Sequence, residues 1–231
     1  MRKGIITLGV IGIIAAFLFG VGPIAYQLLT DRGLQTADLV EGGPEPTTSA
    51  DGHWVIVPGA GANHTQAGYT FREILPGQEK TTSGRADNST EENIKGDLQV
   101  SDGTLTEGLV EVRVAGISSD VEKRDINVRR SILHTEDYPK AKFSITEPVD
   151  LSGIPEDGSV GEVDVTGELT LRGESNKVSA PLKVLRTGDK VVVQGKVPFK
   201  RSDFNIKTPE FVAAKIADEG TIDLLLVFEK P

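Results

Sequence analysis

The sequence predicts an all-β domain: an eight-stranded antiparallel barrel with a short helical segment, preceded by one N-terminal transmembrane helix. Three observations predict this. Apolar and polar residues alternate with a period of two along much of the chain, as in half-buried strands. The 26 Gly and 12 Pro supply the turns that many short strands need. A long apolar run near the N-terminus has the length of a membrane span.

The N-terminal segment starts with two basic residues and continues as an apolar run from Ile5 to Ala25, interrupted only by Thr7. As a helix this run would rise about 31 Å, enough to cross a bilayer core. It is longer than the apolar part of a signal peptide and lacks an A-x-A site. We therefore expect residues 1–30 to be an uncleaved anchor, with cleavage near 20–23 as the alternative. Basic residues before the run place the N-terminus in the cytoplasm and the rest of the chain outside.

Charge and composition divide the rest of the chain. Only two charged residues, both basic, precede Asp31, so residues 31–231 hold 23 basic and 34 acidic residues, a net charge of −11. This acidic balance argues against a nucleic-acid partner, which needs clustered Lys and Arg. Residues 31–50 are rich in Gly, Pro and Thr and are predicted to be a mobile, partly extended linker. Residues 51–231 are predicted to form one domain.

Alternation is clearest in four predicted strands, 110–114, 163–171, 178–184 and 222–228. The last also has apolar residues at Leu225 and Val227, so we expect it to be covered on both faces. Further predicted strands are 68–75, 81–87, 93–100, 140–147 and 190–199, which makes eight or nine in all.

Short turns connect these strands. Asp102-Gly103 and Gly188-Asp189 each separate two strands, as in tight hairpins. Parallel neighbours need connections of a dozen or more residues, so these strands are predicted to be antiparallel.

Residues 118–133 lack alternation and are predicted to form a short helix. Ser119, with Glu122 three residues later, is a capping-box signature. Val121, Asp125, Val128 and Ile132 would share one helical face.

Closing the sheet removes its exposed edges, and an eight-stranded barrel either fills with side chains or holds one small ligand. Only 12 of 231 residues are aromatic, and the inward positions carry mostly small aliphatic side chains. This favours a narrow apolar lumen suited to a flexible hydrocarbon. A barrel with a solid core is the alternative.

Strand parity predicts which side chains face this lumen, and a register error of one residue would turn any strand's set outward. The nine predicted lumen residues are Val112, Val114, Phe143, Val165, Leu169, Leu171, Leu182, Leu224 and Leu226.

Several kinds of chemistry lack their residues. The chain has no cysteine, and its three histidines share no metal-binding spacing. No catalytic, metal or cofactor site is expected, although His134 or Asp125 is the candidate if the domain were a hydrolase or isomerase. Arg124, Asp125 and Asp203 offer a guanidinium and two carboxylates for the barrel rim. The simpler interpretation is an ion pair that holds a loop.

Short motifs in the C-terminal two-thirds resemble the YceI family, polyisoprenoid-binding proteins with a lipocalin-like barrel, and the anchored form resembles an actinobacterial branch. The early segment Gly61–Phe71 departs from the family pattern. The motifs that resemble the family, all within Trp54–Phe228, are Ser119–Asp125 after "VEVRVAGI", Tyr138–Phe143, Val165–Gly173 with Ser175–Val178, and Arg201–Phe204.

This resemblance implies a non-enzymatic carrier that holds an isoprenoid lipid or isoprenoid quinone in the lumen of a membrane-anchored, extracytoplasmic domain. Each buried CH₂ would contribute about 0.8 kcal/mol to binding. The alternative function is an anchored interaction module with a solid core and no ligand. A homodimer, in which one protomer covers the barrel mouth of the other, is compatible with the sequence.

Overall fold

The computed structural model describes residues 34–75, 78–208 and 215–231. The predicted transmembrane segment therefore lies outside the described residues. Among the helices in these three ranges, none has the length and apolar character needed to span a membrane. The described residues belong to one compact unit, Gly33–Pro231.

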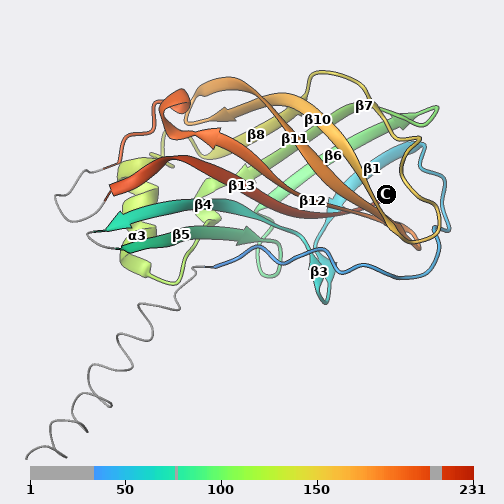
Figure 1. The fold of residues 1–231 in the computed structure, drawn as a ribbon, viewed down its shortest axis with the longest axis horizontal. Helices are drawn as coiled ribbons and strands as arrows, with labels where there is room; N and C mark the ends of the chain where they lie inside the picture. The colour runs from blue at the N-terminus through green and yellow to red at the C-terminus, as the bar shows by residue number, and fades with distance from the viewer. Residues whose placement is uncertain (1–33, 76–77, 209–214) are drawn as a thin grey trace, which may run out of the picture. The chain divides into compact units, whose positions relative to one another are not determined.

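Eight strands form a closed antiparallel barrel (Figure 1). They are β1 (Gly52–Val57), β6 (Ile94–Ser101), β7 (Thr104–Arg113), β8 (Lys140–Ile145), β10 (Val160–Leu171), β11 (Glu174–Thr187), β12 (Lys190–Lys200) and β13 (Lys215–Glu229), in this spatial order. Closure comes from β13, whose last residues pair with β1. The predicted all-β barrel is confirmed.

A hairpin extends this sheet along the other half of β13. β4 (Gln66–Leu75) pairs with β13, and β5 (Gln78–Asp87) pairs with β4. β5 is an edge strand, and exposed edges invite unwanted pairing. Here the Arg85 and Ser118 backbones exchange two hydrogen bonds of 2.8 and 2.9 Å, which joins the edge to the segment after β7.

Short elements complete the chain. They are β2 (Gly59–Ala60), β3 (Asn63–His64), β9 (Val149–Asp150), the 3-10 turns η2 (Val114–Gly116) and η4 (Arg201–Phe204), the helix α3 (Glu122–Asn127) and the π-helical turn η3 (Val128–Ile132). The helix lies at one end of the barrel (Figure 1), which we call the α3 end. The opposite end carries the turns that follow β6 and β11, and we call it the far end.

The predicted helix is present but its N-terminus is built differently. The N-cap residue is Val121, and no side chain caps the helix. Ser119 instead donates its N–H and hydroxyl to Asp125 Oδ1, at 2.8 and 2.6 Å. The buried Asp125 carboxylate therefore takes the place that the capping box assigned to Glu122.

The predicted hairpin turns are also present. Asp102 and Gly103 have φ angles of 51° and 70°, the left-handed pair that a type I′ turn requires. Gly188, with φ 55°, starts the turn between β11 and β12.

Residues 34–50 differ from the predicted mobile linker, because they pack along the outside of the barrel; we call them the strap. Ser83 on β5 donates to Leu34 O at 2.7 Å. At the other end of the strap, Thr47 N–H donates to Gly188 O at 2.7 Å. Between these contacts Leu39 is 9% exposed and packs in an outer cluster. The Gly and Pro content predicts an extended path, but not the apolar surface that receives Leu39.

The strap covers the outer face of β13, as the apolar residues on both faces of that strand predict. Beneath it lies the outer cluster, which consists of Leu39, Leu185, Val192, Leu225 and Val227. The inner face of the barrel carries two further clusters, one at each end.

Candidate functional site: an apolar cavity inside the barrel

A cavity of about 440 Å³ occupies the inside of the barrel. Its lining extends from α3 residues such as Asn127 to far-end residues such as Trp54 and Ile154. This volume falls in the range of roughly 300–1,000 Å³ that is typical of small-molecule sites. Because most lining side chains are aliphatic or aromatic, the cavity suits a hydrocarbon better than a polar ligand.

The cavity-lining side chains come from alternate positions along each strand, which face the inside of the barrel. On β10, Val163, Val165, Leu169 and Leu171 line the cavity. Gly167 interrupts this series because Phe143 on β8 occupies its space: a Cβ at position 167 would lie 2.4 Å from Phe143 Cζ. Glycine here lets the Phe143 ring lie across β10 and form part of the wall.

All nine residues predicted to face the lumen line this cavity. They are Val112, Val114, Phe143, Val165, Leu169, Leu171, Leu182, Leu224 and Leu226. That they contact a ligand stays a prediction.

Helical side chains also line the cavity, which strand parity could not predict. Val128, Ile132 and Leu133 pack with Phe71 at the α3 end, where they fill the gap beside β5. The predicted helical face through Val128 and Ile132 was the signal for their inward direction.

The far end contains few free polar groups. Trp54 and Phe228 are 2% and 1% exposed and pack together in the far-end cluster. Arg186 also lines the cavity there, but its guanidinium binds Glu156 Oε1 at 2.6 Å and Thr48 O at 2.8 Å. Its charge is thus satisfied by the protein, and the far end offers an apolar surface.

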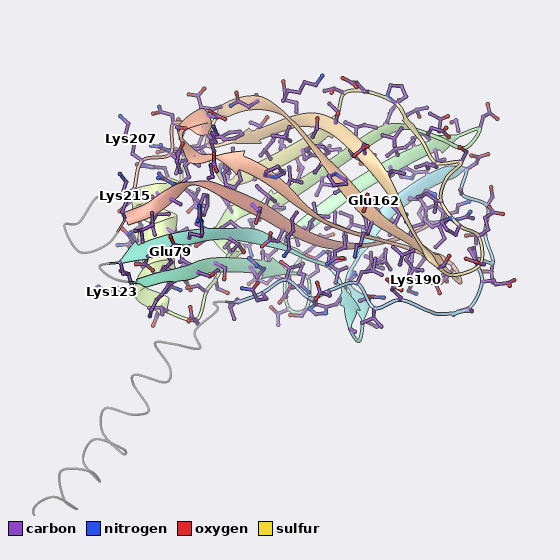
Figure 2. All side chains as sticks on the ribbon, viewed as in Figure 1. Glu79, Lys123, Glu162, Lys190, Lys207 and Lys215 are labelled. Atoms are coloured by element: carbon purple, nitrogen blue, oxygen red, sulfur yellow. The ribbon has the colours of Figure 1, made fainter. Side chains whose placement is uncertain are left out.

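The α3 end is more polar. Glu73, Thr82, Arg124 and Asn127 line the cavity there. Tyr69 lies among them, and burial raises its pKa to about 12. Figure 2 shows Glu79, Lys123, Lys207 and Lys215 at this end of the barrel, so charged side chains gather at the end where the cavity is more polar.

The structure does not bring Arg124, Asp125 and Asp203 into one rim cluster. Arg124 pairs with Asp120 at 2.5 Å, and Asp125 accepts hydrogen bonds from Ser119. Asp203 lies in η4 and its carbonyl accepts from Asn176. The expected pairing of Arg124 with Asp125 is therefore not found, because Arg124 pairs with Asp120, four residues before it.

The hydrolase candidates are used elsewhere in the fold. His134 has a φ of 49°, and its carbonyl accepts the N–H groups of Asp137 and Tyr138. Neither His134 nor Asp125 lines the cavity. In the described ranges, no group of three or more His, Asp or Glu side chains is arranged to hold a metal ion.

The motif Arg201–Phe204 has a structural role at the α3 end. The Arg201 guanidinium donates to the carbonyls of Ala217, Ile206 and Ile216 at 2.9–3.1 Å. Phe204 is 1% exposed and packs edge-to-face against Phe199, with ring centroids 5.8 Å apart. These contacts fix η4 against β13.

Comparison with solved structures identifies the same architecture. Burkholderia cenocepacia BcnA superposes with a TM-score of 0.54 at 22% identity, covering 70% of this chain and 95% of that chain. A polyisoprenoid binding domain from Saccharophagus degradans gives a TM-score of 0.53 at 19% identity, covering 72% and 98%. At these identities the likeness establishes the fold alone.

Sequence comparison adds more specific evidence. Protein YceI from Escherichia coli O157:H7 is 32% identical over 108 residues, which is 43% of this chain and 51% of that protein. The chain thus spans about half the length of the curated relatives it matches. The model of the YceI-like domain matches residues 54–228, three quarters of the sequence. This chain therefore belongs to the YceI-like domain family.

Proposed function

We propose that this protein is a binding protein, not an enzyme, and that it holds an isoprenoid lipid or isoprenoid quinone inside its barrel. The observation that carries the proposal is the cavity of about 440 Å³ with its nearly continuous apolar wall. Such a lining offers a polar solute few hydrogen-bond partners. Burial of each CH₂ of a lipid, in contrast, contributes about 0.8 kcal/mol to binding. The alternative, a barrel with a solid core, does not account for a cavity of this size.

Family membership supports this choice of ligand. The Saccharophagus degradans domain with the same fold is a polyisoprenoid binding domain. An isoprenoid chain is long, thin and uncharged along its length, which matches a cavity lined from one end of the barrel to the other.

We also propose that the barrel works on the extracytoplasmic side, held by the N-terminal segment as a single-pass anchor. The apolar run from Ile5 to Ala25 and the basic residues before it support this topology. Fusion of a reporter that is active only outside the cytoplasm to the C-terminus tests the orientation. An inactive reporter on a stable fusion would contradict it.

Lipid extraction from the full-length chain, purified in detergent from its own membranes, tests the binding function. We expect mass spectrometry to find an isoprenoid lipid at a near-stoichiometric amount. Absence of any such lipid, together with no uptake of an added isoprenoid quinone or polyprenol, would contradict the proposal.

A matched pair of variants on β10 sharpens this test. Val163 lines the cavity, whereas the neighbouring Asp164 is exposed on the outer face. Val163→Trp should fill part of the cavity and reduce the bound lipid several-fold, while Asp164→Trp should leave it unchanged. Thermal melting of both variants establishes that each is folded. Equal lipid content in two folded variants would place the lipid outside the barrel.

A further inference from the structure

Exposed apolar side chains gather at the α3 end. In the described ranges, four of the exposed large hydrophobic residues lie at this end, on the end of β4, on the N-cap or body of α3, or just before β8. They are Ile74, Val121, Ile126 and Tyr138, each 40–44% exposed. Exposed hydrophobics scattered over a surface need no explanation, whereas their collection at one end of a domain is typical of a surface that contacts a protein or a membrane.

The segment formed by α3 and η3 is apolar on two sides. Val128, Ile132 and Leu133 face inward and line the cavity. Val121 and Ile126 lie on the outer side and are exposed. An apolar molecule that contacts the outer side is therefore separated from the cavity by the width of one helix, about 10 Å.

The two ends of the barrel differ in charge. The α3-end segments 114–139, 172–173 and 201–208 hold six acidic and seven basic residues. The far-end segments hold six acidic residues and one basic residue, and these segments are 44–51, 102–103, 151–159, 188–189 and 230–231. The α3 end is thus free of the acidic excess that the domain carries as a whole.

Screening by salt makes this local difference decisive. β11 has 14 residues. At about 3.3 Å per residue, a strand of this length spans about 45 Å. The Debye length at physiological ionic strength is only about 8 Å, so charges at the far end are screened from a surface that touches the α3 end. An anionic membrane at the α3 end would meet a nearly neutral surface on which the basic Lys123 and Arg130 are exposed.

The N-terminal segment joins the barrel on the same side. Leu34 O accepts a hydrogen bond from Ser83 on β5, and Figure 1 shows that the strap begins in the half of the barrel nearer α3. Eight residues separate Leu34 from Ala25, the end of the proposed membrane anchor. This length allows a reach of at most about 30 Å. The anchor therefore holds the start of the strap close to the bilayer, whereas the far end is reached only along the whole strap.

We propose that the α3 end is a membrane-docking surface, and that lipid passes between the bilayer and the cavity at this end. Val121, Ile126 and Ile74 would enter the interface of an anionic bilayer. Tyr138 and Lys123 suit the same interface, where aromatic rings and long basic side chains place their polar ends at the headgroups. This inference rests on the proposed function, since it uses the proposed anchor and assigns the route of the proposed ligand.

Quenching by labelled lipids tests the docking surface on the full-length chain, reconstituted into vesicles of phosphatidylcholine and phosphatidylglycerol. Because the chain has no cysteine, a single-cysteine variant carries one fluorophore at a chosen position. Ile126→Cys reports on the α3 end and Ser152→Cys on the far end. Val40→Cys is the matched control, an exposed apolar residue of the strap. We expect nitroxide-labelled lipids to quench the fluorophore at position 126 several-fold more than at the other two positions.

Charged substitutions test whether this contact serves lipid exchange. The probe is a pyrene-labelled polyprenol, whose transfer from vesicle to barrel lowers the excimer emission of the vesicle. Ile126→Asp should slow this uptake about tenfold, a factor that the lost burial of one large aliphatic side chain can supply. The amount bound at equilibrium should not change, because Ile126 does not line the cavity. Val40→Asp should leave the rate unchanged, and thermal melting establishes that both variants are folded.

The outcomes separate the docking surface from the carrier function. Equal quenching at the three positions, or stronger quenching at position 152 or 40, would overturn the docking surface and leave the barrel as a lipid carrier. An uptake rate that Ile126→Asp does not change would overturn lipid exchange at this end. Quenching at position 126 in a protein that takes up no polyprenol and contains no lipid would overturn the proposed function and leave the docking surface in place.

Discussion

The inner and outer faces of β13 are both apolar, yet they meet different surroundings. On the outer face, Leu225 and Val227 are 0% and 1% exposed because the strap covers them. On the inner face, Leu224 and Leu226 border the cavity. The outer contacts are solid packing, whereas the inner side chains leave space. Burial of an apolar side chain therefore does not by itself indicate its role: here the outer face stabilises the fold and the inner face is available to a ligand.

The outer face also contains the interaction whose loss should destabilise the protein most. Asp223, 3% exposed, accepts hydrogen bonds from Arg85 at 2.9 Å, Thr70 at 2.5 Å and Thr221 at 2.6 Å. Asp223→Ala should lower the free energy of unfolding by about 3–5 kcal/mol, because it leaves the Arg85 charge buried without a partner. Burial already lowers the pKa of Arg85.

Urea denaturation measures this loss. The control is Asp164→Ala, an exposed carboxylate on β10, which should change stability by less than about 0.5 kcal/mol. A loss below about 1 kcal/mol for Asp223→Ala would mean that Arg85 finds other partners or water, and that the outer face is less tightly packed than described.

Two adjacent leucines compare the faces directly. Leu225→Ala should cost about 3 kcal/mol, within the range for leucine in a filled core. Leu224→Ala should cost less in the ligand-free protein, since its side chain borders a void and loses fewer contacts. Lipid content should show the opposite order, falling for Leu224→Ala and not for Leu225→Ala. Equal effects of the two variants on both measurements would remove the distinction between the faces.

The strap is the part of the outer face that differs most from the sequence prediction. Leu39→Ala should cost about 2 kcal/mol, because Leu39 packs on the outer cluster. Its neighbour Val40 is 51% exposed, so Val40→Ala should stay within about 0.5 kcal/mol. Thermal or urea unfolding distinguishes them. If both variants are neutral, residues 34–50 behave as the linker that their composition suggests.

Period-two alternation explains why the inner face could be predicted from the sequence. Once Val165 is assigned inward, the alternation places Leu169 and Leu171 on the same face of β10. Tight turns such as Asp102-Gly103, between β6 and β7, predict that consecutive strands pair with each other. β1 was not predicted, because Trp54–Val57 is a short apolar run without alternation. Its pairing with both β6 and β13 places Trp54 in the far-end cluster, and this long-range contact leaves no local pattern.

Two other features could not be predicted because they depend on long-range contacts: the packing of the strap on the barrel and the polar end of the cavity. Leu39 is one apolar residue in a polar stretch, and only the surplus of apolar residues at Leu225 and Val227 indicated a cover for β13. Tyr69 and Thr82 line the cavity from the paired strands β4 and β5, and Arg124 lines it from α3. Such a meeting of strand and helix depends on tertiary structure.

The smallest expected effect concerns the ionisation of Tyr69 on the inner side of the wall. Burial raises its pKa from 10.0 to about 12, so the folded protein holds this proton more tightly than the unfolded chain. The resulting stability is fully present below pH 10 and is lost as the pH rises toward 12. Ultraviolet absorbance should show a late tyrosine ionisation, and Tyr69→Phe should remove that step and make the alkaline loss of stability shallower. Since Tyr69 is only partly buried, the change in stability should be modest beside that of Asp223→Ala. Ionisation of Tyr69 near pH 10 would show that water reaches its hydroxyl freely and that this end of the cavity is not sheltered from solvent.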